Sequence, residues 1–179
     1  QAGVKLETLT SGDFMAYGNN NGLPPSLYYS VCQTSDGYLW IGSSSGLVRF
    51  DGKRYEVLFS DFADTSTIGD NVITDLVEDH NGNLWLAGFY QGISRYNLSK
   101  GKVKRYPHPL KGPGHAYGLL KVMKDPQGQI WVGTKEHGLG HYIEDQDRFE
   151  YFYLKNPSPD DVSKRGPAVV SDIAIDQQD

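Results

Sequence analysis

The sequence Asp36-Gly37-Tyr38-Leu39-Trp40-Ile41-Gly42, with Gly46-Leu47-Val48-Arg49-Phe50 after it, is the first of three copies of one pattern. The second copy contains Gly82-Asn83-Leu84-Trp85, and the third contains Gly128-Gln129-Ile130-Trp131. The tryptophans at positions 40, 85 and 131 are therefore 45 and 46 residues apart. A period of roughly 40–50 residues with one Gly-x-x-Trp per unit is typical of β-propeller blades.

Each copy predicts four short strands. An apolar segment precedes the turn glycine (Gly37, Gly82 or Gly128), and a second apolar strand carries the tryptophan. A third strand ends at Phe50, Tyr96 or Tyr142, and the fourth is more polar, as expected of a protected sheet edge. We expect one antiparallel sheet, or blade, in each of the segments 27–58, 72–106 and 118–152.

The predicted fold class is all-β, a β-propeller fragment of four-stranded antiparallel blades. Residues 13–17 resemble the outer strand of a preceding or closing blade, and residues 170–179 resemble the first strand of a next blade. The chain of 1–179 would then hold about three and a half blades. Propellers close with roughly four to eight blades. Two copies could therefore form a homodimer that completes a seven-bladed ring.

Composition narrows the possible partners. The net charge of −5 gives no general attraction to nucleic acid or to anionic membranes. No apolar run approaches the roughly 20 residues of a membrane helix, so no direct membrane insertion is expected. The single cysteine, Cys32, cannot form an intrachain disulfide. Its strand position favours a small packed side chain over a reactive thiol.

The pattern Asp-x-x-Gly-x-[Leu/Ile]-Trp-[Ile/Leu/Val]-Gly, with Gly-Leu-x-Arg-[Phe/Tyr]-Asp-Gly after it, resembles the two-component regulator propeller repeat. Ala87 and Gly140-His141 depart from it, as drift within a repeat. The resemblance implies an extracytoplasmic, periplasmic sensor region of a bacterial histidine kinase, hybrid kinase or diguanylate cyclase. It also implies a ligand such as an oligosaccharide and further partners in the rest of the same receptor chain. No cofactor is expected.

Candidate ligand-binding residues lie in the loops between the second and third strands, which share one face with the long connectors. Phe89, Tyr90 and Gln91 combine aromatic faces with an amide, a pairing that suits a sugar ring. Lys135, Glu136 and His137 follow in the third copy. The alternatives are that the aromatic residues pack against a neighbouring blade and that residues 135–137 form a solvated loop tip. The repeated Trp40, Trp85, Trp131 and turn glycines have a structural role.

Other repeated positions are also expected to be structural. The three tryptophans are predicted to fill the space between neighbouring sheets. The same place in the three copies is held by Arg49, Arg95 and His141, which favours a hydrogen bond to a local carbonyl group or stacking on an aromatic ring over a role in ligand binding. Turn capping by Asp79 and Asp125 is favoured over metal binding, and no metal site is expected, because the surrounding loop lacks the alternating oxygen ligands of a calcium site.

Two other functions stay open at this stage. One is a protein-interaction scaffold, which would use the same loops without a distinct motif. The other is a propeller glycosidase or lyase, which needs two carboxylates facing one bond. Asp75, Glu78 and Glu136 are available, but no pair has a defined spacing, and the spacing of the repeat differs from a sialidase Asp box. We therefore expect no catalytic residue in this segment.

Overall fold

The structure is a computed structural model, and it describes residues 18, 20, 22–107, 118–135, 138–152 and 169–175. It contains three four-stranded antiparallel sheets, each built from consecutive strands. The first blade consists of β1 (Tyr28–Gln33), β2 (Leu39–Ser43), β3 (Gly46–Phe50) and β4 (Tyr55–Leu58). The second consists of β5 (Ile73–Glu78), β6 (Asn83–Gly88), β7 (Gly92–Asn97) and β8 (Lys102–Pro107). The third consists of β9 (Leu119–Lys124), β10 (Ile130–Thr134), β11 (Leu139–Ile143) and β12 (Arg148–Phe152).

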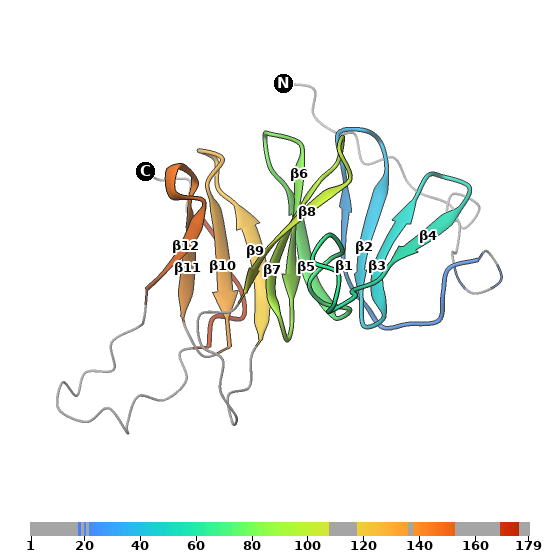
Figure 1. Cartoon of the computed structure of the whole chain (residues 1–179), viewed down its shortest axis with the longest axis horizontal. Coiled ribbons are helices and arrows are strands. Elements are labelled where there is room, and N and C mark those ends of the chain that lie inside the picture. The colour runs from blue at the N-terminus through green and yellow to red at the C-terminus, as the bar shows by residue number, and fades with distance from the viewer. Residues whose placement is uncertain are drawn as a thin grey trace, which may run out of the picture.

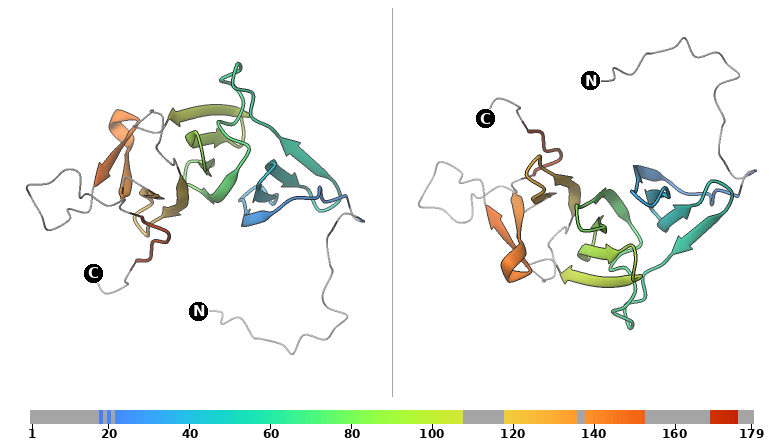
Figure 2. Two further views of the ribbon diagram at one scale, coloured as in Figure 1. Left: turned by 90° about the horizontal axis from the view of Figure 1, so that it is seen from below. Right: turned by 90° about the horizontal axis from the view of Figure 1, so that it is seen from above.

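The sheets stand side by side (Figure 1) and fan out when seen from above or below (Figure 2). The innermost strands are neighbours, with β1 beside β5 and β5 beside β9. A single 3-10 turn, η3 (Glu144–Gln146), lies between β11 and β12, and no α-helix occurs in the described part of the chain. The prediction of an all-β chain with four-stranded antiparallel blades is confirmed.

The turn glycines and the tryptophans form one structural unit in every blade. Gly37, Gly82 and Gly128 all adopt positive φ, the conformation that glycine takes without steric cost. In the second blade the Asp79 carboxylate accepts the backbone N–H groups of Asn81 and Asn83 at 2.8 and 2.9 Å. Its other oxygen accepts the indole N–H of Trp85 at 2.7 Å. The turn therefore fixes the orientation of the tryptophan on the following strand.

The other two blades repeat this link with small changes. Asp125 accepts the indole N–H of Trp131 at 2.9 Å. In the first blade Thr34 replaces the aspartate, and its hydroxyl oxygen accepts the Trp40 indole N–H at 3.1 Å. Turn capping, which the sequence favoured over metal binding for Asp79 and Asp125, is therefore what these aspartates do.

Two apolar clusters fill the junctions between blades. Trp40, buried to 1% exposure, packs between the first and second blades with Leu76, Leu84 and Leu86. Trp85, equally buried, packs between the second and third blades with Leu119, Val122, Ile130 and Tyr142. Trp131 differs because it belongs to neither cluster and is only partly buried. The expectation that the tryptophans fill the space between sheets thus holds for two of the three.

The repeated position opposite each tryptophan stacks on its ring. The guanidinium groups of Arg49 and Arg95 lie 5.8 and 5.5 Å from the ring centres of Trp40 and Trp85. In the third copy the His141 ring stacks on Trp131 at 4.1 Å, with 15° between the planes. The structural role predicted for this position is confirmed, and the histidine preserves it.

The small residue that follows each tryptophan lets the next segment approach closely. A Cβ atom on Gly42 would lie 2.7 Å from the Ile73 carbonyl oxygen, and one on Gly133 would lie 2.5 Å from that of Val170. Ala87 occupies the same place in the second copy and is fully buried. There the Thr74 hydroxyl donates to the carbonyl oxygens of both Ala87 and Leu119, which ties the second blade to the third.

A polar chain links the innermost strands near their bulges. The buried carboxylate of Asp75 accepts the Ser30 hydroxyl at 2.7 Å and the Val122 backbone N–H at 3.0 Å. The Lys121 ammonium lies 3.3 Å from the same carboxylate and 3.9 Å from that of Asp172. Ser30, Asp75 and Lys121 all precede their turn glycine by seven residues, so this chain follows the repeat around the inner edge of the blades.

Neither of the two predicted partial blades lies fully within the described residues. Residues 13–17 lie outside the described residues. Residues 170–175 are not in a strand of this structure and residues 176–179 lie outside the described residues, so the first strand of a next blade stays a prediction. Val170 nevertheless docks on the third blade, where its N–H donates to the Thr134 carbonyl oxygen at 2.8 Å. A strand needs a hydrogen-bonded neighbour, which the apolar pattern of this segment alone does not supply.

The first blade presents an uncovered face. Val31 is 64% exposed, whereas its repeat equivalents Leu76 and Val122 are 5% and 3% exposed because each packs against the preceding blade. Tyr29 on the same strand is 48% exposed. This face is where the second copy of the predicted homodimer would pack, and the ring closure stays a prediction.

The outer rim of the second and third blades is joined by one carboxylate. Asp147, in the left-handed conformation at the end of η3, accepts the hydroxyls of Tyr106 and Tyr142 at 2.5 and 2.7 Å. It also pairs with Lys104 and lies 3.4 Å from Arg95. Partial desolvation pushes its pKa upward, but the hydrogen bonds and the Arg95 charge outweigh it and hold the pKa of Asp147 well below its usual range.

Because the Asp79 side chain joins the turn to Trp85, Asp79→Ala should strongly lower the stability of the fold. The substitution leaves the buried Trp85 indole N–H and two backbone N–H groups without their acceptor, at a cost of about 2–4 kcal/mol in the free energy of unfolding. Urea denaturation measures it. The control is Asp51→Ala, which removes a carboxylate that caps an exposed hairpin through the N–H groups of Lys53 and Arg54. An equal loss of unfolding free energy in the two variants would contradict the importance of the Asp79–Trp85 link.

Asp147 predicts a pH dependence of stability. Because its pKa is depressed in the folded state, its contribution is complete above the unfolded-state pKa of about 3.9 and is lost as the pH falls through the folded value. The side chain is 40% exposed, so solvent screening limits the contribution to about 1 kcal/mol. Asp147→Asn should therefore be less stable than the wild type at pH 7, and the difference should shrink towards pH 2. Exposed Asp145, changed to asparagine, is the control and should show no such convergence.

Candidate functional site

The loop between β6 and β7 carries the aromatic residues that the sequence singled out. It contains Phe89, Tyr90 and Gln91, and it follows Gly88 at the end of β6. The Phe89 N–H donates to the Val72 carbonyl oxygen at 2.9 Å, which ties the loop to the connector that enters β5. The loop and the connector therefore share one end of the second blade, as the predicted topology requires.

A buried carboxylate fixes the conformation of this loop. One oxygen of Asp70, which is 4% exposed, accepts the backbone N–H groups of Tyr90 and Gln91 at 2.5 and 3.0 Å. The other oxygen accepts the Val72 N–H at 2.9 Å. The Asp70 side chain thus uses both oxygens to hold the backbone beneath the two exposed side chains.

The aromatic rings form a small platform, which we define as Phe89, Tyr90, Gln91 and Lys135. Phe89 and Tyr90 contact each other edge to face at 4.8 Å. The Lys135 ammonium, from the β10–β11 loop of the third blade, lies 5.9 Å from the Phe89 ring centre. Gly118 permits this approach, because a Cβ atom there would lie 3.1 Å from the Lys135 Cβ and 3.3 Å from the Phe89 ring. The platform therefore spans two blades.

Phe89 and Tyr90 differ in their surroundings, which bears on whether each contacts a ligand or packs against a neighbouring blade. Phe89 is half-buried under Lys135, which agrees with the packing alternative. Tyr90 is 55% exposed and Gln91 is exposed, so these two residues present their side chains to solvent from a fixed backbone. Glu136 and His137 lie outside the described residues, and their candidate role stays a prediction.

The equivalent loop of the first blade offers less to a ligand. The Ser43 hydroxyl donates to the Gly46 carbonyl oxygen at 2.8 Å, and its oxygen accepts the Ser45 N–H at 3.0 Å. Ser44 exchanges a hydrogen bond with Ser26 at 3.0 Å. The serine hydroxyls therefore close their own short loop, whereas the loop at 88–91 is one residue longer and carries larger side chains.

The carboxylates that a glycosidase would need are engaged elsewhere. Asp75 belongs to the polar chain of the inner strands, with three partners around its buried carboxylate. Glu78 accepts the N–H and the hydroxyl of Ser35 at 2.7 and 2.6 Å, which joins the first and second blades. Among the described residues no group of three or more metal-ligating side chains is assembled. The platform itself supplies stacking and hydrogen-bonding groups, which suit binding.

Asp70 is the residue of this site that the sequence analysis missed. Its repeat equivalents are unrelated residues, so the period of the chain gives no signal for it. Gly118 was missed because it lies at the end of a connector rather than in the repeated turn. Each acts on the platform through the backbone, and neither role can be read from side-chain chemistry alone.

Comparison with known proteins identifies the repeat. The family described as two component regulator propeller matches residues 22–45 and 67–90. Two segments of the chain therefore match the two-component regulator propeller repeat. The matched segments contain the first tryptophan unit and the stretch from the connector to the platform loop. A search of curated proteins gives no match.

Solved structures agree with the propeller fold. The extracellular domain of the putative hybrid two component system BT3049 from B. thetaiotaomicron superposes with a TM-score of 0.67 at 20% identity, over 77% of this chain and 20% of that one. The extracellular domain of BT4673, from the same organism, gives 0.67 at 21% identity, over 88% of this chain and 20% of that one. A virginiamycin B lyase from Staphylococcus aureus gives 0.57 at 19% identity, over 73% and 42%.

At these identities the likeness establishes the fold alone. The chain spans a fifth of the length of the two B. thetaiotaomicron structures. In the part of the chain that the structure describes, no helix has the length and apolarity to cross a membrane.

The role of Asp70 predicts the effect of Asp70→Ala. The N–H groups of Tyr90 and Gln91 lose their acceptor, so their hydrogen exchange should accelerate at least tenfold, while that of β6 and β7 changes little. Exchange followed by NMR measures both. Asp64→Ala is the matched control, because Asp64 caps the Ser66 N–H in the same connector at an exposed position. Unchanged exchange at residues 90 and 91 would remove the positioning role.

Proposed function

We propose that this chain is a ligand-sensing propeller region on the extracytoplasmic side of a bacterial two-component-type receptor. We also propose that it recognises a carbohydrate-like small molecule on the platform of Phe89, Tyr90, Gln91 and Lys135. The observation that carries the proposal is the exposed Tyr90 ring on a backbone already fixed by Asp70. A periplasmic location and further receptor domains are part of the same proposal.

The chemistry of the platform suits a sugar. A sugar ring presents an apolar C–H face that stacks on an aromatic ring and hydroxyls that pair with amides and ammonium groups. Tyr90 offers the ring, Gln91 offers both a donor and an acceptor, and Lys135 offers donors. Since the backbone under these side chains is already ordered, binding loses less conformational entropy than it would on a mobile loop.

The receptor assignment is supported by the match to the repeat family and by the nature of the similar structures. One B. thetaiotaomicron structure is the extracellular domain of a putative hybrid two component system, and the other is that of a putative one component system. The propeller fold alone hosts unrelated functions, as the lyase with the same fold illustrates. The engaged carboxylates Asp75 and Glu78 favour recognition over hydrolysis.

A thermal-shift screen against oligosaccharides tests the proposal. A ligand that binds only the folded state stabilises it by mass action and so raises the melting temperature. The free energy of unfolding increases by about 2.7 kcal/mol when the ligand concentration is a hundred times Kd. Tyr90→Ala should remove at least tenfold of the affinity for any oligosaccharide that the wild type binds, because the stacking surface is lost. Isothermal titration calorimetry gives the two dissociation constants.

Tyr29→Ala is the matched control. Tyr29 is a tyrosine of similar exposure, 48% against 55%, on the uncovered face of the first blade rather than on the platform. Its removal should leave the affinity unchanged. An oligosaccharide that binds the Tyr90→Ala variant as tightly as the wild type would overturn the platform as the binding site.

A further inference from the structure

A second concave site lies at the opposite end of the junction between the second and third blades. It is a crevice of about 230 Å³, bounded by the turns that follow β5 and β9 and by η3 after β11. The platform lies at the loop end of the same blades, so the two sites do not share a residue. The volume is below the ~300–1,000 Å³ of drug-sized sites, which restricts the crevice to a small molecule.

The floor of the crevice is apolar and rigid. Trp85, Ile130 and Tyr142 line it, and all three belong to the buried cluster between the blades. The Trp85 and Tyr142 rings are in contact at 4.6 Å. Because Asp79 already accepts the indole N–H of Trp85, this N–H needs no hydrogen bond from a ligand.

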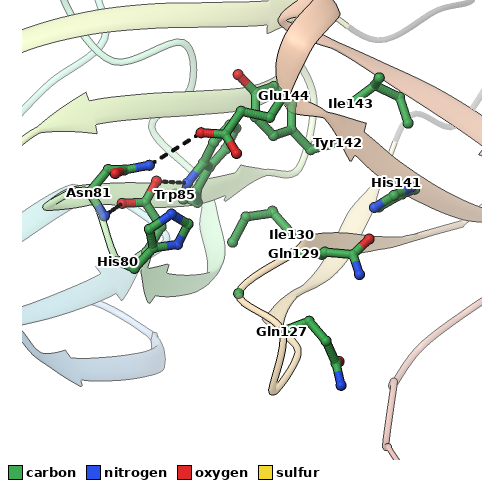
Figure 3. A pocket seen from close by; sticks show the side chains of 12 residues that line it. His80, Asn81, Trp85, Gln127, Gln129, Ile130, His141, Tyr142, Ile143 and Glu144 are labelled. Carbon is green, nitrogen blue, oxygen red and sulfur yellow. Dashed lines mark hydrogen bonds between the residues drawn. The ribbon is translucent and has the colours of Figure 1, made fainter.

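The rim carries hydrogen-bonding groups from both blades. The Asn81 amide donates to the Glu144 carboxylate at 3.3 Å across the mouth of the crevice (Figure 3). Both residues are exposed, and the His80 ring lies beside them. Gly128 lets this ring approach the opposite turn, because a Cβ atom there would lie 3.0 Å from the imidazole Nδ1. His141 borders the crevice, but its ring stacks on Trp131 on the other face of the sheet.

The corresponding junction between the first and second blades is closed. Leu98 holds the place there that Glu144 holds in the third blade, 46 residues later. Leu98 and Tyr38 both pack on the cluster around Trp40. The repeat therefore accommodates an apolar side chain at this position, and the third blade has a solvent-exposed carboxylate in its place. A carboxylate there contributes no apolar packing, which points to a role in binding.

We propose that this crevice binds a single hydroxylated ring, neutral or amino-bearing, of the size of one monosaccharide. Tyr142, the most exposed of the three floor residues, would contact the ring, and Glu144 would accept hydrogen bonds from its hydroxyl or ammonium groups. Asn81 and His80 supply the remaining donors and acceptors. No lysine or arginine lines the crevice, so phosphorylated and other anionic rings are disfavoured.

The test uses D-glucose and D-glucosamine as probes and the indole N–H signals of the three tryptophans in ¹⁵N-labelled protein. Trp85 reports on the crevice through Asp79, which lines it, whereas Trp40 and Trp131 lie outside it. We expect a saturable shift of the Trp85 signal with at least one probe and no shift of the other two. If neither sugar moves the Trp85 signal, or if all three signals move together without saturation, the proposal is overturned.

Glu144→Leu is the decisive variant, because it reproduces the leucine that closes the neighbouring junction. It should lower the affinity for the sugar probe at least tenfold, while the melting temperature stays equal or rises. His80→Ser introduces the residue found at the equivalent position 35. It should lower the affinity for the sugar probe without unfolding the chain. Tyr90→Ala should leave the crevice titration unchanged, so failure of the platform and failure of the crevice are distinguishable. Full binding in Glu144→Leu would overturn the site.

Discussion

The hydrogen bond from each tryptophan indole to the side chain three residues before its turn glycine is the constraint on which this structure depends. It joins a turn to the following strand and orients the largest side chain of the repeat. In the first two blades that side chain fills the next junction and is almost completely buried. Blades that share no hydrogen-bonded strands are thereby joined through apolar contact, to which the inner polar chain and the Asp147 cluster add polar links.

Both candidate sites lie where the repeats differ. The loop at 88–91 gains one residue over its first-blade counterpart, and Asp70, which has no equivalent carboxylate, holds the longer loop in place. Glu144 replaces the packing leucine of the preceding blade and leaves a crevice with a polar rim. The identical parts of the units carry the fold, and these substitutions supply the two candidate sites without disturbing the tryptophan links beneath them.

The same distinction explains what the sequence could predict. Periodicity reveals whatever recurs, so three aligned copies predict the four-stranded blades, the turn glycines and a structural role for Arg49, Arg95 and His141. Asp70 occurs once, and its partners are backbone N–H groups twenty residues away, so no pattern indicates it. The crevice arises from turns of two blades, and only their packing brings His80 beside Gly128. The segment 170–175 has the apolar pattern of a strand but lacks the hydrogen-bonded neighbour that a strand requires.

Both candidate sites span the junction between the second and third blades, at opposite ends of the same packed aromatic cluster. Lys135 and Phe89 face each other at one end, and Glu144 and Asn81 at the other. A ligand at either end would contact both blades. It would therefore stabilise the packed junction between the second and third blades relative to any arrangement in which these blades have moved apart, which we call an opened arrangement. Because linkage is reciprocal, a ligand at one end that stabilises this arrangement must also strengthen binding at the other, to the extent that an opened arrangement is populated. The buried cluster around Trp85 and Tyr142 opposes an opened arrangement, so we expect the coupling between the two candidate sites to be weak.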